Sequence, residues 1–203
     1  MRKLWVYENF SVQLYLLKGQ DKEMTIGLDK SNSIVVKRIS LKQKMLSLQW
    51  NESKDCYDIY EGSEKIGSLG EGKPFTYESL HERLILTLTG QETESLYYIE
   101  TLPAVRFATT GECEILLETV EFDSMQSFTL YRDGEKWKVD PQKETRLYLN
   151  GKKLVNPCPL EDGDLLIWPG MTICIQEGTF LKLSASACYE SSLTETALPV
   201  SEM

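Results

Sequence analysis

The strongest constraint on the fold lies between Leu147 and Ile175, where short apolar stretches alternate with turn residues. Asn150-Gly151 interrupts an alternating apolar pattern, and this dipeptide tolerates the two positive φ angles of a type I′ hairpin turn. Glu161–Asp164 and Pro169-Gly170 then turn the chain twice more between apolar stretches. The segment therefore predicts successive short β-strands that begin with a tight hairpin.

Strand-like stretches recur along most of the remaining sequence. They include residues 4–7, 12–16, 33–36, 84–88 and 97–99. Helical periodicity is weak throughout, and only Phe75 to Arg83 and the region around Glu112 stay ambiguous between a loop and a short helix. Short strands separated by turns are typical of an all-β sandwich.

One apolar pattern occurs twice with the same spacing. Ile34 follows Gly27 by seven residues, and Ile115 follows Ala108 by seven residues. The repeat predicts two tandem domains, at 1–100 and 101–185, with the boundary near Pro103 because proline breaks the preceding strand pattern. Residues 186–203 lack periodicity and are expected to form a flexible tail or linker.

Composition limits the function classes that fit this chain. Its 203 residues carry a formal net charge of −9, which argues against nucleic-acid binding because phosphate affinity needs clustered Lys and Arg. We find no signal-peptide core and no apolar run that could span a bilayer, so we expect a soluble, cytosolic segment without direct membrane insertion. The five cysteines are scattered, and they predict neither a metal site nor disulfides. No cofactor is expected.

The stretch Asn150-Gly151-Lys152, followed by Pro159-Leu160 and Asp162-Gly163-Asp164, resembles the C-terminal half of a forkhead-associated (FHA) domain. The two repeated segments resemble the family's "I-G-R-x-x-x-x-D-I-x-L" start. This resemblance implies two tandem FHA-like β-sandwich domains, a family that binds phosphothreonine peptides or serves in docking.

The residues that would bind phosphothreonine in that family are mostly absent. The family uses an Arg after the first Gly, a Ser-x-x-His, and an Asn that clamps the peptide; the physical need is a bidentate guanidinium with supporting donors. At the corresponding positions this chain has Gly27, Leu28 and Gln43 in the first domain, and Thr109, Ser124, Ser127 and Thr145 in the second. Tight phosphopeptide binding is therefore not expected.

A basic loop lies where the first recognition face would be. Lys37, Arg38, Lys42 and Lys44 bracket Ser40 in an otherwise acidic protein. Two interpretations stay open: a solvated loop, or a patch that binds an acidic partner surface.

Other motifs in the sequence do not support catalysis. Gly67 to Pro74 nearly spells a phosphate-binding P-loop, but Pro74 supplies neither the hydroxyl for Mg²⁺ nor an N–H for phosphate. His81, the single histidine, has no nucleophile motif beside it, and Asp162 and Asp164 flank a turn glycine as backbone-capping residues do. We expect no enzymatic activity from this chain.

Two FHA-like domains with degenerate pockets resemble the N-terminal cytosolic region of the EssC/YukB family of FtsK/SpoIIIE-type membrane ATPases of type VII secretion. The resemblance implies a non-catalytic docking module at the cytoplasmic side of the cell membrane, in a parent protein with transmembrane helices and ATP-binding ATPase domains. Its partners would be other secretion components, such as ubiquitin-like and pseudokinase-like subunits. The alternative is a phosphothreonine-dependent signalling adaptor with a rebuilt, lysine-lined pocket.

Overall fold

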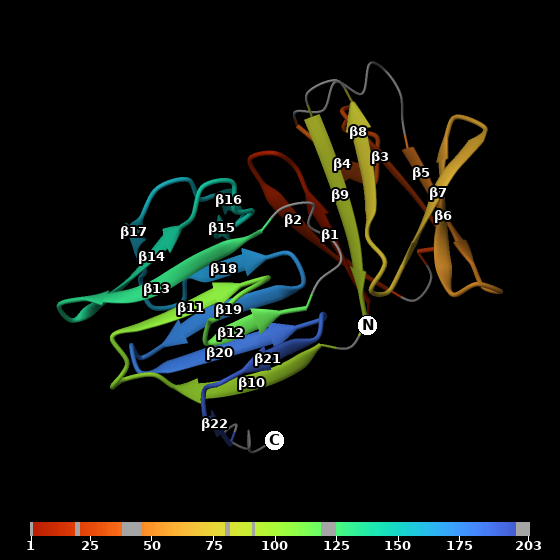
Figure 1. The fold of residues 1–203 in the computed structure, drawn as a ribbon. Helices are drawn as coiled ribbons and strands as arrows, with labels where there is room; N and C mark the ends of the chain where they lie inside the picture. The colour runs from red at the N-terminus through yellow and green to blue at the C-terminus, as the bar shows by residue number, and fades with distance from the viewer. Residues whose placement is uncertain are drawn as a thin grey trace. The chain divides into compact units, whose positions relative to one another are not determined.

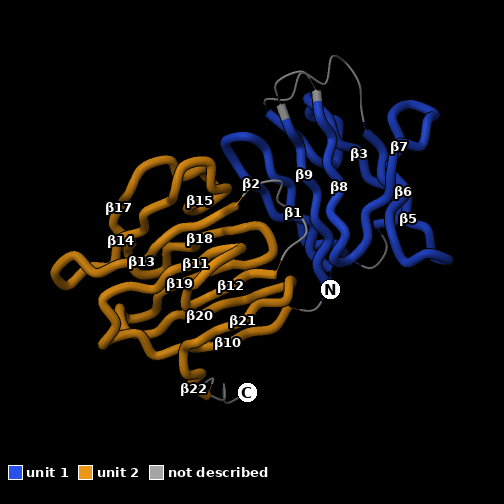
Figure 2. The backbone as a smooth tube through the Cα atoms, viewed as in Figure 1, with its two compact units in different colours: residues 1–91 blue, residues 92–203 orange. Residues whose placement is uncertain are grey.

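A computed structural model describes residues 2–18, 21–37, 46–79, 82–90, 92–118 and 125–197 of the chain. These residues form strands and connections without any α-helix (Figure 1). Accordingly, the described part of the chain holds no helix that could cross a bilayer. The chain divides into two compact units, unit 1 (Met1–Gln91) and unit 2 (Glu92–Met203), shown in different colours in Figure 2. The predicted all-β class with tandem sandwich domains is confirmed.

Unit 1 consists of two mainly antiparallel sheets that enclose one core. The first sheet has the order β2-β1-β9-β8 and contains β1 (Arg2–Tyr7), β2 (Val12–Leu17), β8 (Phe75–Ser79) and β9 (Glu82–Thr89). The second has the order β4-β3-β5-β6-β7 and contains β3 (Glu23–Gly27), β4 (Ile34–Val35), β5 (Leu46–Asn51), β6 (Cys56–Glu61) and β7 (Glu64–Gly70). Alternate residues such as Leu4, Ile26 and Leu86 point into the core between the sheets.

Unit 2 repeats this plan with more strands. One sheet has the order β16-β15-β18-β19-β20-β10-β22 and the other β17-β14-β13-β11-β12-β21. The bounds are β10 (Thr93–Tyr98), β11 (Ala104–Ala108), β12 (Ile115–Leu117), β13 (Ser127–Asp133), β14 (Lys136–Pro141), β15 (Tyr148–Leu149), β16 (Lys152–Lys153), β17 (Cys158–Pro159), β18 (Leu165–Trp168), β19 (Met171–Gln176), β20 (Phe180–Ala185), β21 (Tyr189–Ser191) and β22 (Glu195–Thr196). In its core the rings of Phe107 and Phe128 stack with centroids 4.5 Å apart, and Trp168 meets Phe128 edge-on at 5.2 Å.

The repeated spacing in the sequence corresponds to the same local structure in both units. In unit 1, β3 pairs in parallel with β4, with Ile26 opposite Ile34. In unit 2, β11 pairs in parallel with β12, with Phe107 opposite Ile115. Each pair has the same offset along the chain, so the two connections start from equivalent strand ends.

The predicted hairpin at Asn150-Gly151 is confirmed. Tyr148 pairs with Lys153 across the turn, and both turn residues have positive φ, 49° and 82°. The Asn150 side chain also donates to the Asp164 carboxylate at 2.7 Å, which ties this turn to the next one.

Two expectations about domain limits need correction. The units divide at Gln91/Glu92 rather than at residue 100, because β10 pairs with β20 over its whole length, from Thr93 opposite Ala185 to Tyr98 opposite Phe180. The expected tail at 186–203 also contains strands: β21 pairs with β12, and β22 pairs with β10. The ambiguous stretch at Phe75 to Arg83 holds β8 and the start of β9.

Candidate functional site

The end of unit 1 at which β3 finishes, here called the recognition end, carries the first group of predicted site residues. A Cβ at Gly27 would lie 2.7 Å from the Asn32 Nδ2 atom, so a side chain there would displace Asn32. Asn32 in turn donates to the Asp29 carbonyl at 2.9 Å, and the Asp29 carboxylate accepts from the Ser31 N–H at 2.8 Å. That backbone hydrogen bond lowers the pKa of Asp29. The connection after Gly27 is thus closed by its own polar groups, and Leu28 remains 48% exposed as an apolar side chain.

Lys37 is held at the same end by a carboxylate that sequence reasoning missed. Its backbone N–H donates to Glu8 Oε1 at 2.8 Å, and Glu8 is only 4% exposed. Glu8 Oε2 accepts from the Ser11 hydroxyl at 3.0 Å and from the Gln13 amide at 3.4 Å. Of the predicted basic patch, only Lys37 belongs to the described part of the chain. Arg38, Ser40, Lys42, Gln43 and Lys44 lie outside it, as does Ser124 of unit 2.

The equivalent end of unit 2, at which β11 finishes, is the recognition end of that unit. It brings Thr109, Ser127 and Thr145 together around Gln126. The Thr109 N–H donates to the Gln126 carbonyl at 3.0 Å, and the Thr109 hydroxyl accepts from the Gln126 N–H at 3.1 Å. The Thr145 hydroxyl donates to the Ser127 carbonyl at 2.6 Å. Gln126 and Thr145 are both buried. These side chains therefore use their hydrogen-bonding groups within the fold.

Gln126 is the centre of this network, and no motif in the sequence points to it. Its side-chain oxygen accepts from the Arg146 N–H at 2.7 Å, and its amide donates to the Glu144 carbonyl at 3.4 Å. One glutamine thereby connects β11, the start of β13 and the segment that precedes β15. The neighbouring Met125 is 68% exposed, so an apolar side chain stands at the surface of this end too.

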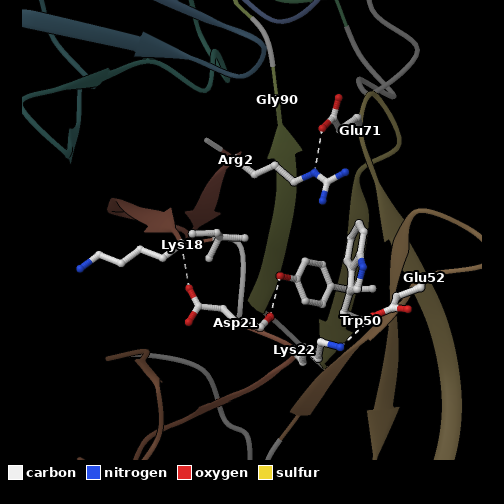
Figure 3. Close-up of a pocket in the computed structure, with 10 residues that line it drawn as sticks. Arg2, Lys18, Asp21, Lys22, Trp50, Glu52, Glu71 and Gly90 are labelled. Carbon is white, nitrogen blue, oxygen red and sulfur yellow. Dashed lines mark hydrogen bonds and ion pairs between the residues drawn. The ribbon is translucent and has the colours of Figure 1, made fainter.

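A cavity of about 690 Å³ lies at the opposite end of unit 1 (Figure 3). Lys22 and Trp50 line it where β3 begins, whereas Gly27 lies where β3 ends. The Arg2 guanidinium stacks on the Trp50 ring, 4.3 Å from its centroid, and Trp50 meets Tyr57 edge-on at 4.8 Å. Figure 3 shows Trp50 below the Arg2 guanidinium.

Arg2 and Lys22, two of the cations that line this cavity, pair with carboxylates. Arg2 donates to Glu71 at 3.0 Å and to Asp55 at 2.6 Å, while Lys22 donates to Glu52 at 2.8 Å. Burial lowers the pKa of Arg2, but the hydrogen bonds to the two carboxylates outweigh it and raise that pKa overall. The cavity has aromatic and aliphatic walls, and the cations Arg2 and Lys22 are neutralised by carboxylates. It therefore resembles a surface pocket more than a catalytic centre.

The other motifs considered in the sequence have structural explanations where the chain is described. Gly67 lies within β7, and a Cβ there would meet the Phe75 ring at 2.5 Å, so this glycine makes room for an aromatic side chain. Asp162 accepts from the Glu177 N–H, and Asp164 from the Glu161 N–H, as turn-capping carboxylates. His81 lies outside the described residues. Within the described residues, no three His, Cys, Asp or Glu side chains gather as metal ligands.

Comparison with known proteins identifies the family. Residues 3–119 match the FtsK/SpoIIIE N-terminal family, described as a DNA transporter. The chain belongs to this family. It is 28% identical to the ESX secretion system protein YukB of Bacillus subtilis (strain 168) and 26% identical to the ESX secretion system protein EccC of Geobacillus thermodenitrificans (strain NG80-2). Each match covers 100% of this chain but only 14% and 13% of the respective relative.

A solved structure supports the fold over nearly the whole chain. The N-terminal FHA domain from EssC, a component of the bacterial type VII secretion apparatus, superimposes with a TM-score of 0.82 at 24% identity. The match covers 98% of this chain and 99% of the other. The predicted resemblance to the N-terminal region of EssC/YukB-type proteins is confirmed.

Proposed function

We propose that this chain is a non-catalytic docking module of a type VII secretion membrane ATPase, which helps to assemble the export machine at the cytoplasmic side of the membrane. The parent protein would resemble the FtsK/SpoIIIE-type ATPases, with its ATPase domains beyond this region. The chain spans about one seventh of its curated relatives, so the parent's activity, location and partners form part of this proposal.

The observation that carries the proposal is the hydrogen-bonded closure of the recognition end in unit 2. A phosphothreonine reader must present unsatisfied donors to a doubly charged phosphate. Here the Thr109 and Thr145 hydroxyls and the Gln126 amide already donate to backbone carbonyls within the fold. This supports a degenerate FHA domain that serves a role other than phosphate recognition.

Unit 1 offers a different kind of surface at its recognition end. Leu28 is exposed where the family has a guanidinium, and exposed Lys37 is fixed by its backbone to Glu8. An apolar side chain beside a basic segment suits a protein surface that is both apolar and acidic. We therefore propose that other secretion components dock at this end, with Lys37 and, outside the described residues, Arg38, Lys42 and Lys44 as the basic contribution.

The test is association of the purified chain with the other secretion components, measured by biolayer interferometry over a series of salt concentrations. Reversing Arg38→Glu and Lys42→Glu together should slow association and flatten its salt dependence, because basic side chains steer the encounter with an acidic partner surface. Lys152→Glu with Lys153→Glu in β16 makes the same charge change in unit 2 and should leave association unchanged. Equal association of both double variants with every component would refute the docking role of this end.

A second arm addresses the adaptor alternative. Matched threonine and phosphothreonine peptides should bind equally weakly to the wild-type chain. A strong preference for the phosphorylated peptide that the Arg38/Lys42 variant loses would instead establish a rebuilt, lysine-lined phosphothreonine pocket.

A further inference from the structure

The edge strand β2 of unit 1 differs from every other sheet edge in the described part of the chain. Edge strands invite pairing with another chain, and proteins protect them with charged residues, proline, irregular register or very short length. The other edges have such protection: Glu78 in β8, Glu64 and Lys65 in β7, Lys152 and Lys153 in β16, Glu190 in β21, Glu195 in β22, Pro159 in β17, and a length of two residues in β4. The six residues of β2 contain no charge and no proline.

The geometry of β2 is also regular. It pairs with β1 without a register shift from Val12 opposite Tyr7 to Leu17 opposite Arg2. Leu17 belongs to the core of unit 1, and Tyr15 packs against it. Leu14 and Leu16 therefore point to the opposite face of the sheet, where they are 43% and 52% exposed. An uninterrupted strand with apolar side chains on its outer face is suited to accept a further strand.

We propose that β2 pairs antiparallel with β2 of a second copy of this chain, about a two-fold axis at Leu14. In this register Leu14 lies opposite Leu14 of the second copy, Val12 opposite Leu16, and Gln13 opposite Tyr15. Apolar residues meet apolar residues on one face, and the polar pair meets on the other. The sequence of β2 is thus complementary to an antiparallel copy of itself, which favours a second copy of this chain over an unrelated strand.

The charge pattern also fits a second copy. The chain carries a formal net charge of −9, so two copies repel one another overall. From Ser11 to Leu17 the chain has no charged residue, and pairing along β2 therefore places no like charges opposite one another. The dimer continues the sheet β8-β9-β1-β2 into its copy and leaves the recognition end, with Leu28 and Lys37, outside the strand pairing. The proposal is independent of the docking function.

The test measures the mass of the intact 203-residue chain by sedimentation velocity over a range of concentrations. The wild type should shift from its monomer mass of 23.3 kDa to twice that mass as concentration rises. Leu14→Lys should remain monomeric, because the symmetric register places two lysines opposite each other. Leu28→Lys is the matched control: a leucine of similar exposure in the same unit, whose replacement should leave the dimer intact.

A charge-swap experiment tests the register itself. Leu14→Lys and Leu14→Glu should each be monomeric alone, and an equimolar mixture should form a heterodimer, since only a two-fold axis at residue 14 brings the two new side chains together. Far-UV circular dichroism verifies that each variant is folded, and Leu16→Lys, which would face Val12, replaces Leu14→Lys if that variant unfolds. A wild type that stays monomeric at all concentrations, a dimer that survives Leu14→Lys, or a mixture without heterodimer each overturns the proposal.

Discussion

Replacing Gln126 with alanine should destabilise unit 2 far more than any change at the exposed residue beside it. Gln126→Ala removes the acceptor of the Arg146 N–H and the donor to the Glu144 carbonyl. Each hydrogen bond contributes about 0.5 to 1.5 kcal/mol, and the half-buried Arg146 N–H left without its acceptor adds about 1 kcal/mol. The expected loss of unfolding free energy is about 2 to 4 kcal/mol for unit 2.

Urea unfolding followed by NMR of the tryptophan indole signals measures this loss for each unit separately. Trp137 and Trp168 report on unit 2, and Trp5 and Trp50 report on unit 1. For a slope of about 2 kcal/mol per M urea, the unit 2 midpoint should fall by about 1 to 2 M. The unit 1 signals should keep their midpoint.

Met125→Ala is the control, because Met125 is the exposed neighbour of Gln126 and its truncation should cost less than about 0.5 kcal/mol. If both variants unfold at the same urea concentration, the Gln126 hydrogen bonds do not hold the recognition end of unit 2 closed, and its donors remain free for a phosphate.

Three further outcomes are expected. Gly67→Ala should lower the unfolding free energy of unit 1 by about 1 to 3 kcal/mol in urea titrations, because its Cβ would overlap the Phe75 ring; a neutral result would contradict the close approach. Hydrogen bonds from Arg106 lower the pKa of Glu114, so this pair stabilises unit 2 above the ordinary carboxyl pKa of 4.5, and the stabilisation disappears as pH falls through the lowered value. Arg106→Met should therefore lower the unfolding free energy of unit 2 at neutral pH and lower it less in acid. A difference that does not change with pH would disprove the linkage. Calorimetric titration with Mg²⁺ and ATP should give no binding heat, because Pro74 stands at the hydroxyl position of the P-loop-like string and much of that string is a β-strand; Mg²⁺-dependent binding would refute this.

Local chemistry made part of the fold predictable. The Asn150-Gly151 turn depends on the conformations of two residues, and its flanking alternation sets the register, so both can be read from a short segment. The repeat that starts at Gly27 and Ala108 was predictable for a similar reason, since equal spacing places equivalent strands at equivalent positions in the two units.

Long-range pairing was not predictable in the same way. β10 follows the last strand of unit 1 directly in sequence, and nothing within it reveals that it pairs with β20, more than eighty residues later. β21 and β22 have only three and two residues, which is too short for a period-two pattern to stand out. Their place in the sheets depends on partners that a local reading cannot see.

The same distinction applies to the site. The family resemblance predicts Leu28, Thr109 and Thr145 as departures from a phosphothreonine pocket, and that prediction could be made because it depends only on spacing within a local motif. It could not find Glu8 or Gln126, whose roles come from the distant groups they bond, Lys37 and Arg146. An acidic residue and a glutamine in polar stretches look like surface residues until the fold supplies partners for them.

The two units have the same framework but differ in what their recognition ends present. In unit 2 the polar side chains are bonded within the fold, and the Arg106 guanidinium, paired with Glu114 at 2.8 Å, fastens the connection between β11 and β12. In unit 1 a buried carboxylate holds the backbone at Lys37 while Leu28 stays exposed. The Val36 N–H donates to the Gly27 carbonyl at 3.0 Å, so the backbone next to Leu28 and Lys37 is already ordered, which lowers the entropy cost of binding a partner. This difference is consistent with the proposal that a partner docks on unit 1, with unit 2 as structural support.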